Sequence, residues 1–186
     1  MAQQQNGYAI VPHDNYDDFR YYALTHGVNV DYSWGNQCWD ICALVWFQYG
    51  LRLATGPNGY AYECWTVSRN INARGPFTMI TNLSDVKRGD VVVFRAFGSY
   101  YTGHIGFCDE DYHGGAMRVL SQNQGQGISW GTPSNVINYN ASLFIGAFRN
   151  TEWQVTPPTP PTPTPTETAK KRVPWVLYAN KLRQTR

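Results

Sequence analysis

The strongest hydrophobic pattern in the chain is the uninterrupted apolar run at residues 41–47 (ICALVWF). A run without a polar face, followed by Gly50, predicts a buried helix over residues 41–49. A second helix is predicted from an N-cap at Asp14 to about His26, where apolar and aromatic residues recur at helical intervals. Both predicted helices precede the strand-like part of the chain.

Short apolar and β-branched runs dominate the later part of the sequence. They predict strands over residues 91–94, 103–107, 117–120 and 143–148. Between the helices and the strands, residues 54–82 are rich in Gly, Asn and aromatic residues. This composition predicts surface loops with one short helix, which would form one wall of a groove.

The composition divides the 186 residues into three parts. Residues 1–150 are long enough for one folded domain with its own core. Residues 151–168 form a Pro/Thr-rich linker, which predicts an extended polyproline II spacer. Residues 169–186 form a basic aromatic tail. It is too short for a domain, and is interpreted as an anchor to a partner, an amphipathic surface binder, or the remnant of a second module.

The net charge of +2 is unevenly distributed along the chain. Residues 167–186 hold six Lys/Arg and one Glu, a net of +5, so residues 1–166 carry 2 − 5 = −3. A mildly acidic domain argues against nucleic-acid binding. No apolar run is long enough to predict a membrane span. Residues 1–7 lack the basic and apolar regions of a secretion signal, so we expect no signal peptide.

Cys38 is the candidate nucleophile, because it stands where the buried helix begins, near the positive end of the helix dipole, which favours the thiolate. The candidate base is His104, which lies on a predicted strand between Gly103 and Gly106. About one hairpin later comes the polar segment 121–124 (SQNQ). An adjacent antiparallel strand would place one of these side chains beside the histidine, completing a papain-like order of nucleophile, base and orienting group.

Oxygen-bearing residues precede the cysteine at alternate positions. They match positions one, three, five, seven, nine and twelve of an EF-hand-type loop, and are Asn29, Asp31, Ser33, Gly35, Gln37 and Asp40. Trp34 occupies the sixth position, where an EF-hand has Gly, and the last residue is Asp instead of Glu. The pattern therefore predicts a calcium-supported loop that fixes the cysteine, although not a standard EF-hand.

Six sequence blocks resemble, in the family's order, the landmarks of CHAP domains, which are cysteine, histidine-dependent amidohydrolases/peptidases. The resemblance covers roughly residues 14–150, and its blocks are 37–40 (QCWD), 59–61 (GYA) with Trp65, 88–94 (RGDVVVF), 103–107 (GHIGF), 119–123 (VLSQN) and 145–149 (IGAFR). It implies a papain-like α+β fold, with N-terminal helices packed on an antiparallel, partly barrelled sheet. It also implies hydrolysis of bacterial peptidoglycan, at the muramoyl–L-alanine amide or at a peptide bond of the stem or cross-bridge.

The resemblance implies roles for individual residues. Cys38 would attack the scissile carbonyl, His104 would act as base, and Asn123 would orient the histidine, because Ser121 stands where similar lysins often have Glu. Backbone N–H groups of Cys38 and Trp39, with Gln37 as a further candidate, would form the oxyanion hole. Phage members of the family often carry calcium in the preceding loop, which implies ligands at Asn29, Asp31, Ser33, Gly35 and Asp40. Candidate groove rings, each equally compatible with packing, are Tyr60, Tyr62, Trp65 and Trp130.

Three other functions fit parts of the pattern. An NlpC/P60-type peptidase shares the Cys-His order, and an amide-forming synthase shares the nucleophile. A catalytically silent wall-binding or virion module would keep the fold alone. The expected context is a bacteriophage. The protein would be either an endolysin released from the host cytoplasm to the cell wall or a hydrolase mounted on the virion tail, where the tail segment would contact other virion proteins.

Overall fold

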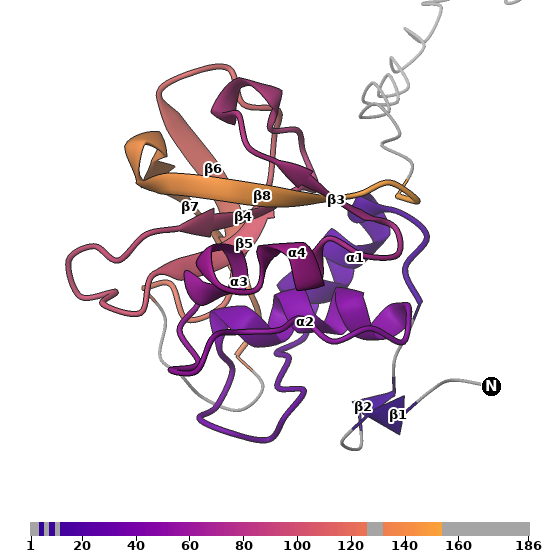
Figure 1. Cartoon of the computed structure of the whole chain (residues 1–186). Helices are drawn as coiled ribbons and strands as arrows, with labels where there is room; N and C mark the ends of the chain where they lie inside the picture. The colour runs from indigo at the N-terminus through magenta and orange to yellow at the C-terminus, as the bar shows by residue number, and fades with distance from the viewer. Residues whose placement is uncertain (1–3, 6–7, 10–11, 126–131, 154–186) are drawn as a thin grey trace, which may run out of the picture. The chain divides into compact units, whose positions relative to one another are not determined.

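The computed structural model describes residues 4–5, 8–9, 12–125 and 132–153 (Figure 1). Trp130, the linker and the basic tail therefore lie outside the described residues. Two short strands, β1 (Gln4–Gln5) and β2 (Tyr8–Ala9), pair antiparallel near the start of the chain. Within the described residues, no helix has the length and hydrophobicity needed to cross a membrane.

Four helices lie on one side of the main sheet (Figure 1). They are α1 (Tyr16–Thr25), α2 (Cys38–Gln48), α3 (Glu63–Thr66) and α4 (Arg69–Asn72). The N-cap of α1 is Asn15, so the expected cap at Asp14 is wrong by one residue. Asn15 Oδ1 accepts a hydrogen bond from the Asp18 N–H at 2.9 Å, which satisfies one of the free donors of the first turn.

The predicted cysteine helix is confirmed as α2. It begins at Cys38 and ends before Tyr49, and Gly50 follows with φ +67°. Its side chains from Ile41 to Phe47 are all buried, in agreement with the absence of a polar face in the sequence. The helix packs against the strand that carries His104, which brings the two candidate catalytic residues into one region.

The main sheet has six antiparallel strands in the order β3-β8-β4-β5-β6-β7 and is not closed. The strands are β3 (Phe77–Ile80), β4 (Val91–Phe94), β5 (His104–Cys108), β6 (Ala116–Ser121), β7 (Asn135–Asn140) and β8 (Phe144–Asn150). Two short 3₁₀ helices, η1 (Leu83–Asp85) and η2 (Ala141–Leu143), precede β4 and β8. The α+β, papain-like fold class is confirmed. The sequence pattern missed β3, which lies in the predicted loop region, and β7, which is interrupted by asparagines.

Each face of the sheet contributes to a separate hydrophobic cluster, because side chains alternate along a strand. On β4, Val91 and Val93 pack toward the helices, whereas Val92 and Phe94 join the cluster on the other face. Trp46 of α2 stacks on Phe77, with ring centroids 3.8 Å apart and the planes 3° from parallel. The helices are thereby fixed on the sheet by aromatic packing.

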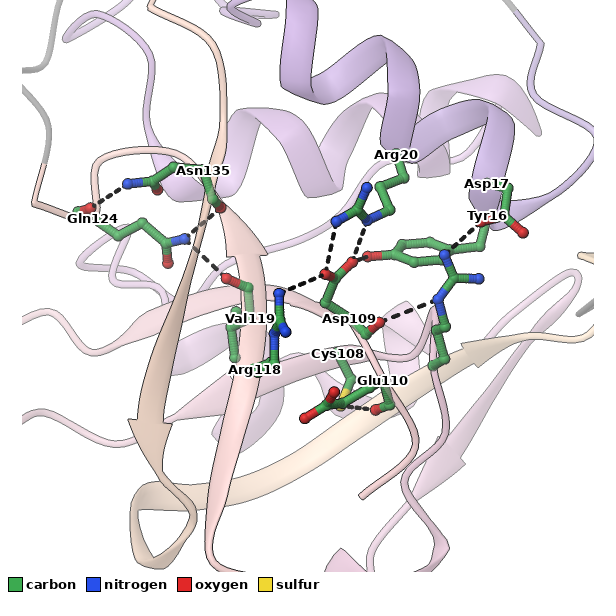
Figure 2. Close-up of polar contacts among 11 residues, drawn as sticks. Tyr16, Asp17, Arg20, Cys108, Asp109, Glu110, Arg118, Val119, Gln124 and Asn135 are labelled. Atoms are coloured by element: carbon green, nitrogen blue, oxygen red, sulfur yellow. Dashed lines mark hydrogen bonds and ion pairs between the residues drawn. The ribbon is translucent and has the colours of Figure 1, made fainter. Parts of the chain in front are cut away.

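A buried carboxylate ties α1 to the end of β5 (Figure 2). Asp109 accepts hydrogen bonds from the Arg20 guanidinium at 2.6 and 3.0 Å and from the Tyr16 hydroxyl at 2.8 Å. Arg118 of β6 approaches the same carboxylate to 3.8 Å. Because Asp109 is almost fully buried, these partners are required to compensate for the loss of hydration of its charge.

We expect Asp109→Ala to lower the free energy of unfolding by about 2–4 kcal/mol, because Tyr16 and Arg20 would lose their acceptor. Urea denaturation at neutral pH measures this change. The matched control is Glu110→Ala, one residue further along and exposed, for which we expect less than about 0.5 kcal/mol. Equal effects of the two substitutions would contradict this account of the network.

Candidate active site

Cys38 is the first residue of α2 and retains 8 % exposure. Burial raises the pKa of its thiol to about 11, although hydrogen bonds from the backbone of Ile105 and Trp39 oppose that shift. The helix start is where the sequence predicted it, but desolvation outweighs the dipole effect that favoured a thiolate. In the free protein the thiol is therefore protonated at neutral pH.

His104 is the first residue of β5 and lies opposite Phe94 of β4. The contact between the thiol and the backbone of Ile105 places Cys38 beside the residue that follows His104 in the chain. Tyr139 of β7 links the same two groups, since its ring stacks on His104 and its hydroxyl interacts electrostatically with the thiol. The helix start and the strand start therefore meet at one site.

The His104 ring is held on three sides. Tyr139 stacks on it at a centroid distance of 5.1 Å and an angle of 14°, and Tyr100 meets it edge-on at 5.4 Å and 68°. Gln124 Oε1 lies 3.1 Å from the ring nitrogen Nε2. Burial lowers the pKa of His104 to about 4, opposed by the hydrogen bond with Gln124, so the imidazole is neutral at pH 7.

Three consecutive polar residues at the end of β6 connect this site to its surroundings. Gln122 donates to the carbonyl groups of Val28 and Gln37 and accepts from the Val28 N–H. Asn123, with φ +52°, donates to Gln37 Oε1 at 3.1 Å. The side chain hydrogen-bonded to the His104 ring is that of Gln124, the last residue of the predicted polar segment, and not that of Asn123. Asn123, expected to orient His104, contacts Gln37 in this structure, and its orienting role stays a prediction.

The candidate oxyanion donors lie at the start of α2. Backbone N–H groups of Cys38 and Trp39 approach the Cys38 sulfur, and the first N–H groups of a helix have no partner within the helix. The Gln37 side chain already donates to the Trp34 carbonyl at 2.6 Å, which holds the preceding loop against the helix start. Their part in stabilising an oxyanion stays a prediction.

The backbone of the loop of the predicted calcium site folds around the Asn29 side chain. This side chain is fully buried, its amide nitrogen lies 2.5 Å from the Gly35 carbonyl and 3.4 Å from that of Ser33, and its Oδ1 has no hydrogen-bond partner. Asp31 is exposed, and its carboxylate accepts from the Ser33 N–H. Asp40, fully buried, accepts from the N–H groups of Val30 and Gln37.

The aromatic residues predicted for a groove have different environments. Tyr60 and Tyr62 are half-buried with ring centroids 5.8 Å apart, and the exposed Tyr101 meets Tyr60 edge-on at 6.1 Å. Trp65 is buried against Phe148, and its ring covers the α-carbon of Gly146, so it is a core residue and not a groove residue.

Sequence reasoning missed two residues that contact the candidate base. Tyr139 lies on β7, a strand that the hydrophobic pattern did not reveal, and Tyr100 lies in the turn before β5. Tyr100 lies only four residues before His104, in a Tyr/Gly-rich turn. Its closeness in sequence could have indicated the contact. No sequence signal placed Tyr139 beside His104.

A thiol at the start of a helix, packed against a strand that begins with a histidine on an α+β scaffold, is the arrangement of papain-like domains. A family model described as the CHAP domain matches residues 27–123, just over half of the chain. The chain therefore belongs to the CHAP domain family.

Two known proteins resemble this chain, one in sequence and one in fold. Over 112 residues it is 31% identical to a D-alanyl-L-alanine endopeptidase of Streptococcus phage B30, a match that covers 59% of this chain and 25% of the relative. The chain thus spans about a quarter of the length of that protein. The crystal structure of the wild-type endolysin LysIME-EF1 has the same fold, with a TM-score of 0.54 and 24% identity over 77% of this chain and 67% of that one.

The buried neutral His104 should make folding stability depend on pH. Its folded pKa lies below the usual value, so the unfolded chain binds more protons between about pH 6.5 and 4, and stability falls as the pH is lowered through that window. The size of the shift corresponds to roughly 3 kcal/mol. We expect His104→Gln to reduce the slope of unfolding free energy against pH in this window.

Urea denaturation of the wild-type and variant proteins at several pH values measures the slope. A His104→Gln protein with the full wild-type slope would refute the assignment of this pH dependence to His104.

Proposed function

We propose that this chain hydrolyses an amide bond of bacterial peptidoglycan, with Cys38 as nucleophile and His104 as base, and that it acts as a phage lysin. The observation that carries the proposal is the meeting of the α2 thiol with the start of β5, where the buried imidazole is held by Gln124 and Tyr139. Membership of the CHAP family and the phage relatives support the substrate class.

In the proposed reaction, His104 accepts the thiol proton as the Cys38 sulfur attacks the scissile carbonyl carbon. The carbon–nitrogen bond then breaks, and the imidazolium gives its proton to the departing amine. A thioester between Cys38 and the acyl fragment remains. Water, deprotonated by His104, attacks this thioester, releases the carboxylic acid and restores the thiol. The N–H groups of Cys38 and Trp39 are the proposed donors to the oxyanion of each step.

We further propose that the bond is a peptide bond of the stem or cross-bridge. The name of the relative from Streptococcus phage B30, a D-alanyl-L-alanine endopeptidase, favours this over the muramoyl–L-alanine amide. Fragment masses separate the two cases. Amidase action would free glycan without peptide, whereas endopeptidase action would leave part of the stem on the glycan.

Cys38→Ala and His104→Ala should each reduce the release of amines from purified Gram-positive peptidoglycan by at least about 10²-fold, because the nucleophile or its base is lost. Mass spectrometry of the soluble fragments and a labelling assay for new amino groups measure the reaction. Cys108→Ala, a thiol at the far end of β5, is the matched control. Wall cleavage by the Cys38→Ala protein would rule out the nucleophile. Absence of cleavage by wild type across several wall types would favour a silent wall-binding module.

We also propose that the loop before α2 binds Ca²⁺. The donors would be Asn29, Asp31, Ser33, Gly35 and Asp40, all of which offer the oxygen atoms that this ion prefers. The buried Oδ1 of Asn29, which has no hydrogen-bond partner, supports the fit. The ion would stabilise the loop that leads into Cys38, and would not take part in the reaction.

Calcium should therefore raise the melting temperature, and Asp31→Ala should reduce the difference between calcium and chelator. At free calcium one hundred times the dissociation constant, the expected stabilisation is about 2.7 kcal/mol. Differential scanning calorimetry measures it, with Asp14→Ala, exposed and outside the loop, as the control. Identical melting of the wild-type protein in calcium and in chelator would exclude the site.

A further inference from the structure

The Gln124 side chain is locked in one orientation. It is fully buried, and its amide nitrogen donates to the Val119 carbonyl at 2.9 Å and to the Asn135 carbonyl at 2.7 Å (Figure 2). The Asn135 side-chain amide donates a hydrogen bond to the backbone carbonyl of Gln124 at 3.2 Å. Carbonyl oxygens only accept, so the two hydrogens of the Gln124 amide group are both donated to the Val119 and Asn135 carbonyls. Exchanging the amide oxygen and nitrogen would remove these two hydrogen bonds.

This orientation determines which atom faces the histidine. Gln124 Oε1, which only accepts, lies 3.1 Å from His104 Nε2, so the hydrogen of that contact must be on Nε2. A neutral imidazole has a single N–H group, and burial keeps His104 neutral. The lone pair is therefore on Nδ1. Stacking on Tyr139 and the edge contact of Tyr100 prevent the ring from turning away.

We propose that Gln124 is the residue that positions His104 for catalysis, by fixing the tautomer in which Nε2 carries the hydrogen and Nδ1 is the base. Asn123 then contacts the nucleophile helix instead of the histidine, since its side chain donates a hydrogen bond to Gln37 at the start of that helix. The catalytic meaning of this inference rests on the proposed function. The tautomer itself does not, and can be measured separately.

The first test is ¹⁵N NMR of histidine-labelled wild-type protein at neutral pH, without substrate. The expected result is a His104 with a protonated Nε2 and an unprotonated Nδ1. In Gln124→Met, which has a similar volume but no hydrogen-bonding groups, this assignment should be lost or mixed. A protonated Nδ1 in the wild-type protein would overturn the inference, whatever the variants do.

The second test separates positioning from packing by kinetics on peptidoglycan. Gln124→Met should lower kcat by about 10²-fold with KM little changed, because the base would be misoriented without loss of substrate contacts. Gln124→Glu keeps an acceptor for the Nε2 hydrogen. Its second carboxyl oxygen faces the Val119 and Asn135 carbonyls in place of the amide nitrogen, so we expect it to be protonated, to donate to one of them and to recover part of the loss in kcat. Indistinguishable kcat values for the two variants would reduce Gln124 to a packing residue.

The matched control is Gln48→Met. Gln48 also joins two backbone groups, the N–H and carbonyl of His13, but lies at the other end of α2. It should lose stability without changing the His104 tautomer or kcat. If the wild-type protein cleaves no wall but shows the Nε2–H tautomer, the proposed function fails and the positioning of His104 stands. If it cleaves the wall and shows the Nδ1–H tautomer, the proposed function stands and the positioning of His104 by Gln124 fails.

Discussion

The packing of the α2 N-terminus against the start of β5 is the contact on which the site depends. It places the Cys38 sulfur at the backbone of Ile105 and so beside His104, while burying both side chains. Burial has a cost, because it shifts the pKa of the thiol upward and that of the imidazole downward, away from the charged forms. The scaffold therefore holds a neutral pair whose reactivity depends on geometry, and polar neighbours must maintain that geometry.

Those neighbours come largely from one short segment. Gln122, Asn123 and Gln124 follow β6 directly. Gln122 binds both Val28 and the α2 cap residue Gln37, Asn123 binds Gln37, and Gln124 binds the histidine of β5. A shift of this segment would disturb nucleophile and base together. The site is thus built as a unit between the helix start and the central strands, while the Asp109 network holds α1 at the opposite end of β5.

Much of this could be predicted from the sequence, because local patterns determine it. The all-apolar run predicted α2, the short apolar run at 103–107 predicted the strand of His104, and the polar segment 121–124 was expected beside it. The pattern could not choose among four adjacent polar residues. That choice depends on the positive φ of Asn123 and on the carbonyls of Val119 and Asn135, which tertiary structure alone brings together. For the same reason the sequence could not decide between a groove role and a packing role for Trp65, since its partner Gly146 lies on a distant strand.

The central claim is that Cys38 forms the acyl-enzyme, and acid quenching during peptidoglycan digestion tests it most directly. Peptide mapping by mass spectrometry of the quenched protein should find a wall-derived acyl group on Cys38, and none on Cys42, Cys64 or Cys108, which are buried deeper. The adduct should be absent from the Cys38→Ala protein. Continued digestion with no adduct on Cys38, or with an adduct on another residue, would contradict the account.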